Sequence, residues 1–186
     1  MRTSTLLALT CLLAVYGCAT DDNTSDDQQN RTDMKSRADG RQMTAEQFVT
    51  QAASSGMFEV QSSQLAKEKQ APAPTLEFAQ EMIRDHTKAN NELKQIAAQR
   101  NIKVPGQMLP RHQQMVDELK SLSGHQFSTR YMTMQNQAHT EAIDLFTRAS
   151  NQLEDQDLRN FAVRTLPTLK EHRQDAQKLI GGNMPK

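Results

Sequence analysis

The chain has 186 residues, and its 22 Lys and Arg residues balance its 22 Asp and Glu residues, so its formal net charge is zero. This length is typical of one domain with tails. Binding to nucleic acid needs a basic surface, so the charge balance gives no reason to expect a nucleic-acid partner. Tryptophan is absent and aromatic residues make up only 4% of the chain, which favours helices over a β-sandwich or barrel.

Residues 1–17 have the features of a secretory leader. Arg2 precedes an apolar run, Leu6–Val15, which as a helix spans about 15 Å and is too short to cross a bilayer. The next residues, up to Gly17 and Cys18, resemble the bacterial lipobox, in which a small residue precedes a lipidated cysteine. We therefore expect a lipoprotein signal peptide over 1–17 and lipidation of Cys18. An ordinary signal peptide cut near Ala19 is the alternative.

The resemblance to bacterial lipoproteins also implies a location. Ala19 stands where an aspartate would retain the protein in the inner membrane, so we expect a lipid anchor in the outer membrane, on its periplasmic face. Residues 18–43 should form a disordered tether, because no Leu, Ile, Val or aromatic residue occurs from Ala19 to Met43 and ordering such a segment buries little apolar surface. No cysteine follows Cys18, so we expect no disulfide bond within the mature chain.

Residues 44–182 are expected to form one all-α domain. Apolar residues recur every three or four positions in four long segments, the first opening with a capping-box sequence at Thr44–Gln47 and the last ending at Gly181–Gly182. The connections within each pair of segments are short, whereas residues 100–124 between the pairs form a long connection with a short amphipathic piece. Two antiparallel hairpins joined by such a crossover are the connectivity of a ferritin-like four-helix bundle.

Each long segment carries one ionisable residue on or beside its apolar stripe. A buried carboxylate or imidazole is costly unless it is paired or bound to a metal. Counting residues from the turns places three of these side chains near one level, whereas the fourth, His172, falls about 7 Å away at the helical rise per residue. The residues are Glu59, His86, His139 and His172.

Two interpretations of this group stay open. Imidazole and carboxylate are ligands for zinc, iron or copper, so the four residues are a candidate site for a single divalent metal ion. Asp85 is expected to contact these ligands and not the ion. The Glu-x-x-His pairs of di-iron bundles are absent, which argues against a carboxylate-bridged pair of ions. Alternatively, Glu59 and Asp85 accept hydrogen bonds from the imidazoles in a purely structural network. His112 and His125 fall in the crossover and are expected to be solvated.

Several sequence blocks resemble one bacterial family, the domain of unknown function 4142, whose members are thought to be envelope proteins with a ferritin-like bundle. The blocks include Gly56-Met57-Phe58-Glu59-Val60, Asp85-His86-Thr87-Lys88-Ala89-Asn90, and Leu166-Pro167 followed by Leu169 and His172. The resemblance covers about residues 44–180. It implies a fold and a compartment but no activity, and Glu59, Asp85, His86, His139 and His172 match the family pattern by position.

The sequence contains no known catalytic motif: no nucleophile elbow, phosphate-binding loop, dinucleotide fingerprint or zinc-protease helix occurs. We therefore expect a non-enzymatic binding or structural protein of the envelope, with another envelope protein as a candidate partner. The alternative is a metal-binding protein, or a metal-dependent redox or stress protein, that uses Glu59 and the three histidines. Nothing in the sequence indicates an oligomeric state.

Overall fold

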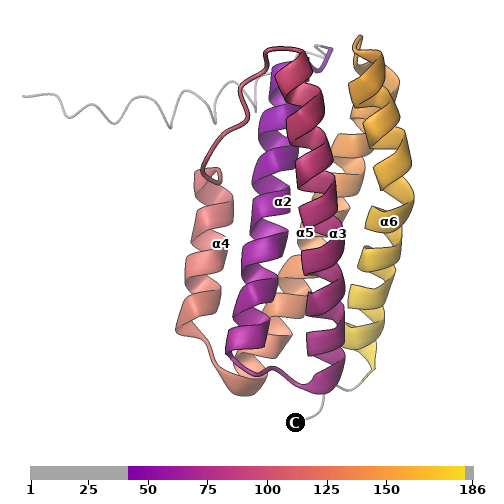
Figure 1. The fold of residues 1–186 in the computed structure, drawn as a ribbon. Helices are drawn as coiled ribbons and strands as arrows, with labels where there is room; N and C mark the ends of the chain where they lie inside the picture. The colour runs from indigo at the N-terminus through magenta and orange to yellow at the C-terminus, as the bar shows by residue number, and fades with distance from the viewer. Residues whose placement is uncertain (1–41, 183–186) are drawn as a thin grey trace, which may run out of the picture.

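The structure is a computed structural model, and it describes residues 42–182 (Figure 1). The expected leader over 1–17, the lipidation site Cys18 and nearly all of the expected tether lie outside these residues. The part of the chain that the structure describes contains helices and no strand, so the expected all-α class is confirmed. The helices are α2 (Ala45–Glu68), α3 (Ala73–Gln99), α4 (Pro110–Ser121), α5 (Gly124–Gln152) and α6 (Gln156–Gly181).

Local sequence signals explain where the helices begin and end. The Thr44 side chain accepts a hydrogen bond from the Gln47 backbone N–H, and the Gln47 side chain accepts one from the Thr44 N–H, so the predicted capping box forms. At the start of α6, the Asp155 carboxylate accepts from the Leu158 N–H. The same helix ends at Gly181, where it was predicted to end.

The two hairpins predicted from the connection lengths are present. Helices α2 and α3 form the first hairpin and α5 and α6 the second, and across the bundle α2 packs on α5 and α3 packs on α6. Residues 100–123 run from one end of the bundle to the other, and their helix α4 packs against α2 and α5 (Figure 1). Because the crossover returns the chain to the opposite end, α3 and α5 point in the same direction.

The apolar core is divided into two clusters along the bundle. One cluster contains Phe48, Phe146 and Phe161, with the first two rings 5.1 Å apart in an edge-to-face contact. The other contains Phe78 and Tyr131, among others. On α3, α5 and α6, the residues of the two clusters lie on opposite sides of a short interval that holds His86, His139 and His172 respectively. A layer of imidazoles therefore separates the two apolar clusters.

Helices α2 and α3 approach each other closely near this layer. A Cβ atom on Gly56 would overlap the Asn90 side chain of the facing helix, so a larger residue at this position would force Asn90 to move. A second glycine has a backbone role, since Gly124 opens α5 with φ +54°, directly after the turn that follows α4.

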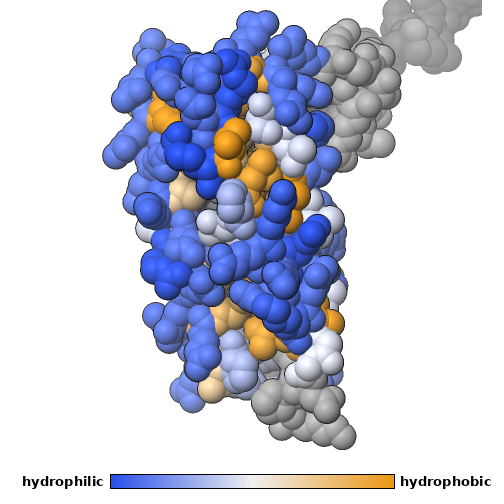
Figure 2. All heavy atoms as spheres, turned by 90° about the vertical axis from the view of Figure 1, so that its right-hand side faces the viewer, coloured by the Kyte–Doolittle hydropathy of each residue, from blue (hydrophilic) through white to orange (hydrophobic). Residues whose placement is uncertain are grey.

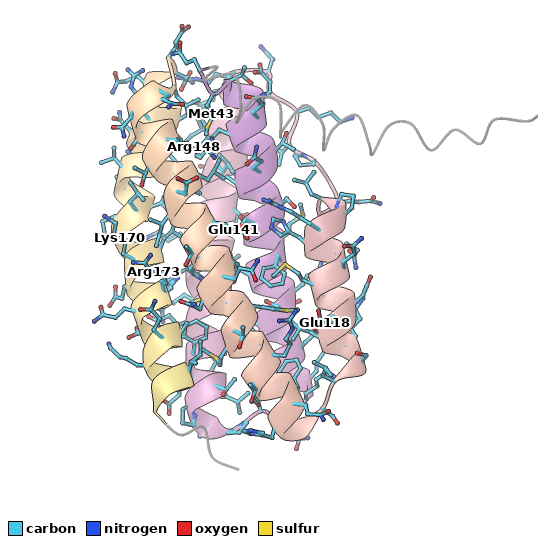
Figure 3. All side chains as sticks on the ribbon, turned by 180° about the vertical axis from the view of Figure 1, so that it is seen from behind. Met43, Glu118, Glu141, Arg148, Lys170 and Arg173 are labelled. Atoms are coloured by element: carbon cyan, nitrogen blue, oxygen red, sulfur yellow. The ribbon has the colours of Figure 1, made fainter. Side chains whose placement is uncertain are left out.

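The outside of the bundle is mainly polar. The face shown in Figure 2 is mostly hydrophilic and interrupted by small hydrophobic patches, and the exposed large hydrophobic residues in the described part of the chain are Val163 and Ile180. Seen from behind (Figure 3), Glu118 on α4 and Glu141 on α5 lie on the outer surface. No helix among residues 42–182 is long and apolar enough to cross a membrane.

Candidate metal centre

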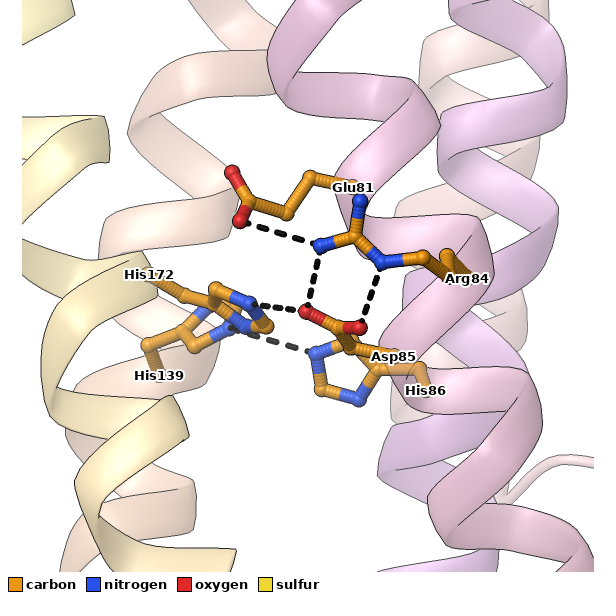
Figure 4. Close-up of polar contacts among 6 residues, drawn as sticks. All are labelled: Glu81, Arg84, Asp85, His86, His139 and His172. Atoms are coloured by element: carbon orange, nitrogen blue, oxygen red, sulfur yellow. Dashed lines mark hydrogen bonds and ion pairs between the residues drawn. The ribbon is translucent and has the colours of Figure 1, made fainter.

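Three histidine side chains from three helices meet in the layer between the apolar clusters (Figure 4). The His139 Nε2 atom lies 3.4 Å from His86 Nε2 and 3.4 Å from His172 Nδ1. His86, His139 and His172 are only 8%, 0% and 1% exposed. The layer therefore brings together nitrogens from α3, α5 and α6. It includes His172, which counting residues along the helices had placed about 7 Å from the level of the others.

The backbone of α5 fixes the tautomer of His139. Its Nδ1 lies 2.8 Å from the carbonyl oxygen of Gln135, one turn earlier in the helix. A carbonyl oxygen only accepts hydrogen bonds, so Nδ1 carries the proton and donates it. In the neutral ring the other nitrogen then has a free lone pair. The His139 Nε2 lone pair therefore faces the other two imidazoles.

A carboxylate fixes the tautomer of His172 in the same way. Its Nε2 lies 3.2 Å from Asp85 Oδ2, and the carboxylate can only accept, so Nε2 carries the proton and Nδ1 has the lone pair. That lone pair faces His139 Nε2. Two acceptor nitrogens that face each other at 3.4 Å cannot hydrogen-bond to one another, whereas a cation between them would bind to both.

Asp85 is itself held by an arginine on the same helix. Arg84 donates from Nε to Asp85 Oδ1 at 2.8 Å and from Nη2 to Oδ2 at 3.1 Å, and Nη2 also reaches Glu81 at 3.2 Å. Burial opposes ionisation of Asp85, but the hydrogen bonds from Arg84 and His172 hold the pKa of this carboxyl below its usual range. Asp85 therefore stays ionised behind His172.

The three imidazoles are neutral at neutral pH. Burial lowers the pKa of His139 to about 3. Burial and the two neighbouring histidines lower the pKa of His86 well below 6.5, and burial lowers the pKa of His172 despite the opposing effect of Asp85. Because metals bind the unprotonated imidazole nitrogen, protonation does not compete for these lone pairs near pH 7.

Glu59 does not join the three nitrogens. Its Oε1 atom lies 3.8 Å from Nδ1 of His139, the nitrogen that points away from the other imidazoles. The side chain is 1% exposed, and neither carboxylate oxygen has a hydrogen-bond partner, while the Gln135 amide donates to Ser62. Burial therefore raises the pKa of Glu59 well above its usual range.

Sequence reasoning missed three residues of this region: Glu81, Arg84 and Gln135. Glu81 lies one helical turn before Asp85, so the spacing of four residues was the available signal that both carboxylates share a face. Nothing in the sequence showed that this face of α3 lies against His172. The role of Gln135 depends on its backbone carbonyl, which carries no sequence signal.

The expectation that His112 is solvated was wrong, because this residue is 2% exposed. The Ser54 hydroxyl accepts from the Leu109 N–H at 2.7 Å and forms a second hydrogen bond with His112 Nδ1, also at 2.7 Å. The His112 ring also stacks on Phe58. The short helix α4 is thus fixed to α2 through a buried contact that its amphipathic pattern did not reveal, whereas His125 is exposed as expected.

The geometry of the three nitrogens fits a metal ion. Tetrahedral zinc with zinc–nitrogen bonds of about 2.0–2.1 Å places neighbouring ligand atoms about 3.3–3.4 Å apart. The His139 Nε2 atom lies 3.4 Å from both His86 Nε2 and His172 Nδ1, and the three ligand atoms all lie within 4.8 Å of one another. Three protein ligands would leave the fourth position of such an ion to a water or another small ligand.

Comparisons with known proteins identify the family. A search of curated proteins and a search of solved structures each returned no match. The family model described as Domain of unknown function (DUF4142) matches residues 29–179. The match begins within the segment that we expect to be a tether and spans all of the helices up to the last turn of α6. The chain therefore belongs to the DUF4142 family.

Proposed function

We propose that this bundle binds one divalent transition-metal ion through His86 Nε2, His139 Nε2 and His172 Nδ1. One observation carries the proposal: two imidazole nitrogens whose protons are held on the far side of each ring face one another at 3.4 Å in the core. A shared proton would make one ring cationic, and burial lowers the pKa of both His139 and His172. A metal ion also loses solvation on burial, but it gains a bond to the lone pair of each nitrogen, which a single shared proton does not.

The ligand types indicate the class of ion. Imidazole suits zinc, copper, nickel, cobalt and iron, whereas calcium and magnesium prefer several oxygen ligands. The hydrogen bond from His172 to Asp85 is the arrangement that orients a metal-bound imidazole and increases its basicity. The negative charge of Asp85 also lowers the cost of holding a cation in the buried layer.

Direct metal binding tests the proposal. The full chain, purified without a histidine tag, is treated with a chelator, supplied with Co²⁺, and followed by the visible absorption of tetrahedral Co²⁺ and by elemental analysis. The expected result is one ion per chain for wild type, and an affinity at least about 100-fold lower for His139→Gln, because loss of a ligand removes both a bond and the tautomer arrangement. His112→Gln is the matched control, since His112 is buried but lies outside the group.

Two results would contradict the metal site. Wild-type protein that takes up no Co²⁺, Zn²⁺ or Cu²⁺ at micromolar concentration would refute it, and so would equal affinities of wild type and His139→Gln. In either case the histidine layer would be a structural network. A melting temperature of wild type that rises with zinc, while that of His139→Gln does not, gives independent support, because an ion that is present at 100 times its Kd adds about 2.7 kcal/mol to the free energy of unfolding.

We also infer that the bundle is carried in the cell envelope on a lipid anchor at Cys18. The support comes from the leader-like residues 1–17 and from the lipobox resemblance that ends at Gly17 and Cys18. Metabolic labelling with a radioactive fatty acid tests this inference. Label should enter wild type and be absent from Cys18→Ser, and equal labelling of the two proteins would contradict the anchor.

A further inference from the structure

A second group of possible ligands lies between the histidine layer and the solvent. Carboxylate oxygens of Glu81 and Asp85 and a ring nitrogen of His172 all lie within 4.8 Å of one another. The three histidines are almost completely buried, whereas the side chains of Asp85 and Glu81 are 25% and 35% exposed. Exposure therefore increases stepwise from His172 through Asp85 to Glu81, on the side of the site where α3 faces α6 (Figure 4).

His172 belongs to both groups. Its Nε2 atom contacts Asp85 in the outer group, and its Nδ1 atom faces His139 in the inner group. A single imidazole ring thus spans the distance between the carboxylates and the buried nitrogens. The inner group also points to a cation through His139, which is fully buried and whose Nε2 lone pair is oriented by the Gln135 carbonyl and not by a carboxylate.

A cationic side chain occupies the outer group in the structure. The Arg84 guanidinium bridges Asp85 and Glu81. The rest of the Arg84 side chain faces solvent, since 66% of it is exposed. Surface ion pairs of this kind are weak, commonly below about 1 kcal/mol. A small divalent cation therefore competes with Arg84 for two carboxylates that are already close together.

We propose that Glu81 and Asp85 form a loading site, at which a hydrated divalent metal ion displaces the Arg84 guanidinium and is held before it moves inward to the three histidine nitrogens. The proposal rests on the proposed function. An ion that went directly into the buried layer would have to lose most of its hydration shell before the histidine nitrogens could replace the lost waters. Carboxylates accept a cation that keeps several of its waters, so the ion exchanges water for protein ligands in steps.

A loading site and simple electrostatic attraction predict different effects of Glu81→Gln on the association and dissociation rate constants of the metal ion. If Glu81 only attracted the ion, Glu81→Gln would lower the association rate constant and raise the dissociation rate constant. If Glu81 lies on the path, its removal slows passage in both directions. For Co²⁺ we expect association about tenfold slower and dissociation also slower. Arg84→Gln removes the competitor for the carboxylates, so both rates should rise.

Stopped-flow absorption of Co²⁺ with the full chain measures both rates, with chelator added to follow release. The matched control is Glu92→Gln, because Glu92 pairs with Arg164 across the same helices α3 and α6 and its side chain is similarly exposed, at 38%. Rates of Glu81→Gln that equal those of Glu92→Gln would overturn the loading site. So would dissociation from Glu81→Gln that is unchanged or faster, or a fall in either rate for Arg84→Gln.

The two proposals fail in different ways. Wild type that shows no tetrahedral Co²⁺ absorption contradicts the metal centre itself. Wild type that binds Co²⁺ while the rates follow one of the overturning patterns leaves the metal centre in place and removes only the loading site.

Discussion

Replacing Glu59 by glutamine is expected to stabilise the metal-free protein at neutral pH. Glu59 is 1% exposed, and no donor contacts either of its carboxylate oxygens. Glutamine has nearly the same shape and carries no charge. Its amide also provides N–H donors close to Gln135, whose own Oε1 atom is buried without a partner.

The magnitude follows from the raised pKa of Glu59. Its ordinary pKa is 4.5, and burial raises the folded-state value well above this. Above pH 4.5 the unfolded chain releases the Glu59 proton while the folded protein keeps it, so the free energy of unfolding falls as the pH rises. The loss is about 1.4 kcal/mol for each pH unit between 4.5 and the folded-state pKa. Because a glutamine side chain does not titrate, Glu59→Gln avoids this loss.

Urea unfolding of chelator-treated protein at pH 5.5 and pH 7.5 measures the effect. The stability difference between Glu59→Gln and wild type should grow between these pH values, by about 1.4 kcal/mol for each pH unit of the interval that lies below the folded-state pKa of Glu59. The titration of the buried histidines is common to both proteins and cancels in the difference. Glu77→Gln, a change at an exposed glutamate, is the control and should show no such growth.

One result would refute the reasoning about Glu59. If Glu59→Gln is no more stable than wild type at pH 7.5, or if its advantage does not increase with pH, the carboxyl is not held protonated by burial. The folded protein would then have to stabilise the Glu59 carboxylate through a hydrogen bond or an ion pair.

Four further predictions concern the layer and its supports. Asp85→Asn should weaken Co²⁺ affinity about 10- to 100-fold in a chelator competition assay, because it removes the carboxylate that orients His172; unchanged affinity would contradict this. Ser54→Ala should lower the free energy of unfolding in urea by about 2–4 kcal/mol, because the Leu109 N–H and His112 Nδ1 both lose their partner, and Ser55→Ala is the control. Burial lowers the pKa of His112 to about 4, so the stability of the metal-free protein should fall as the pH drops from 6.5 to 4. His112→Gln should remove about 1.4 kcal/mol per pH unit of that slope, and an unchanged slope would contradict it. Gly56→Ala should lower the free energy of unfolding of wild type, because the new methyl group overlaps Asn90. In an Asn90→Ala background the same change should raise it by about 1 kcal/mol through helix propensity. An equal effect of Gly56→Ala in the two backgrounds would contradict the close contact.

Helix periodicity and capping made most of the fold predictable. The capping box at Thr44 and the helix end at Gly181 are local features, and the length of the segment between the hairpins set the connectivity. The imidazole layer could also be anticipated, because His86, His139 and His172 interrupt apolar stripes. Those signals depend only on neighbouring residues in the chain.

The parts that sequence could not supply depend on rotation and tilt between helices. Counting residues along untilted rods put His172 off the common level, although the structure places its Nδ1 atom 3.4 Å from His139. Glu59 was a candidate ligand in one of the two open interpretations, and the structure places it 3.8 Å from Nδ1 of His139, the nitrogen that points away from the other imidazoles. The burial of His112 depends on Ser54, which lies 58 positions away in the chain. Such pairings follow from how whole helices pack, which no short sequence pattern encodes.

The division of the imidazole layer between the two hairpins has a consequence for folding. His86 belongs to the first hairpin, whereas His139 and His172 belong to the second, and 53 residues separate His86 from His139. Neither half of the chain contains the complete set, so the three nitrogens meet only after the halves have docked. Contacts between distant residues form late, because a long loop must close first. An ion bound there would link the two hairpins, and its main effect would be to slow the unfolding step in which they separate.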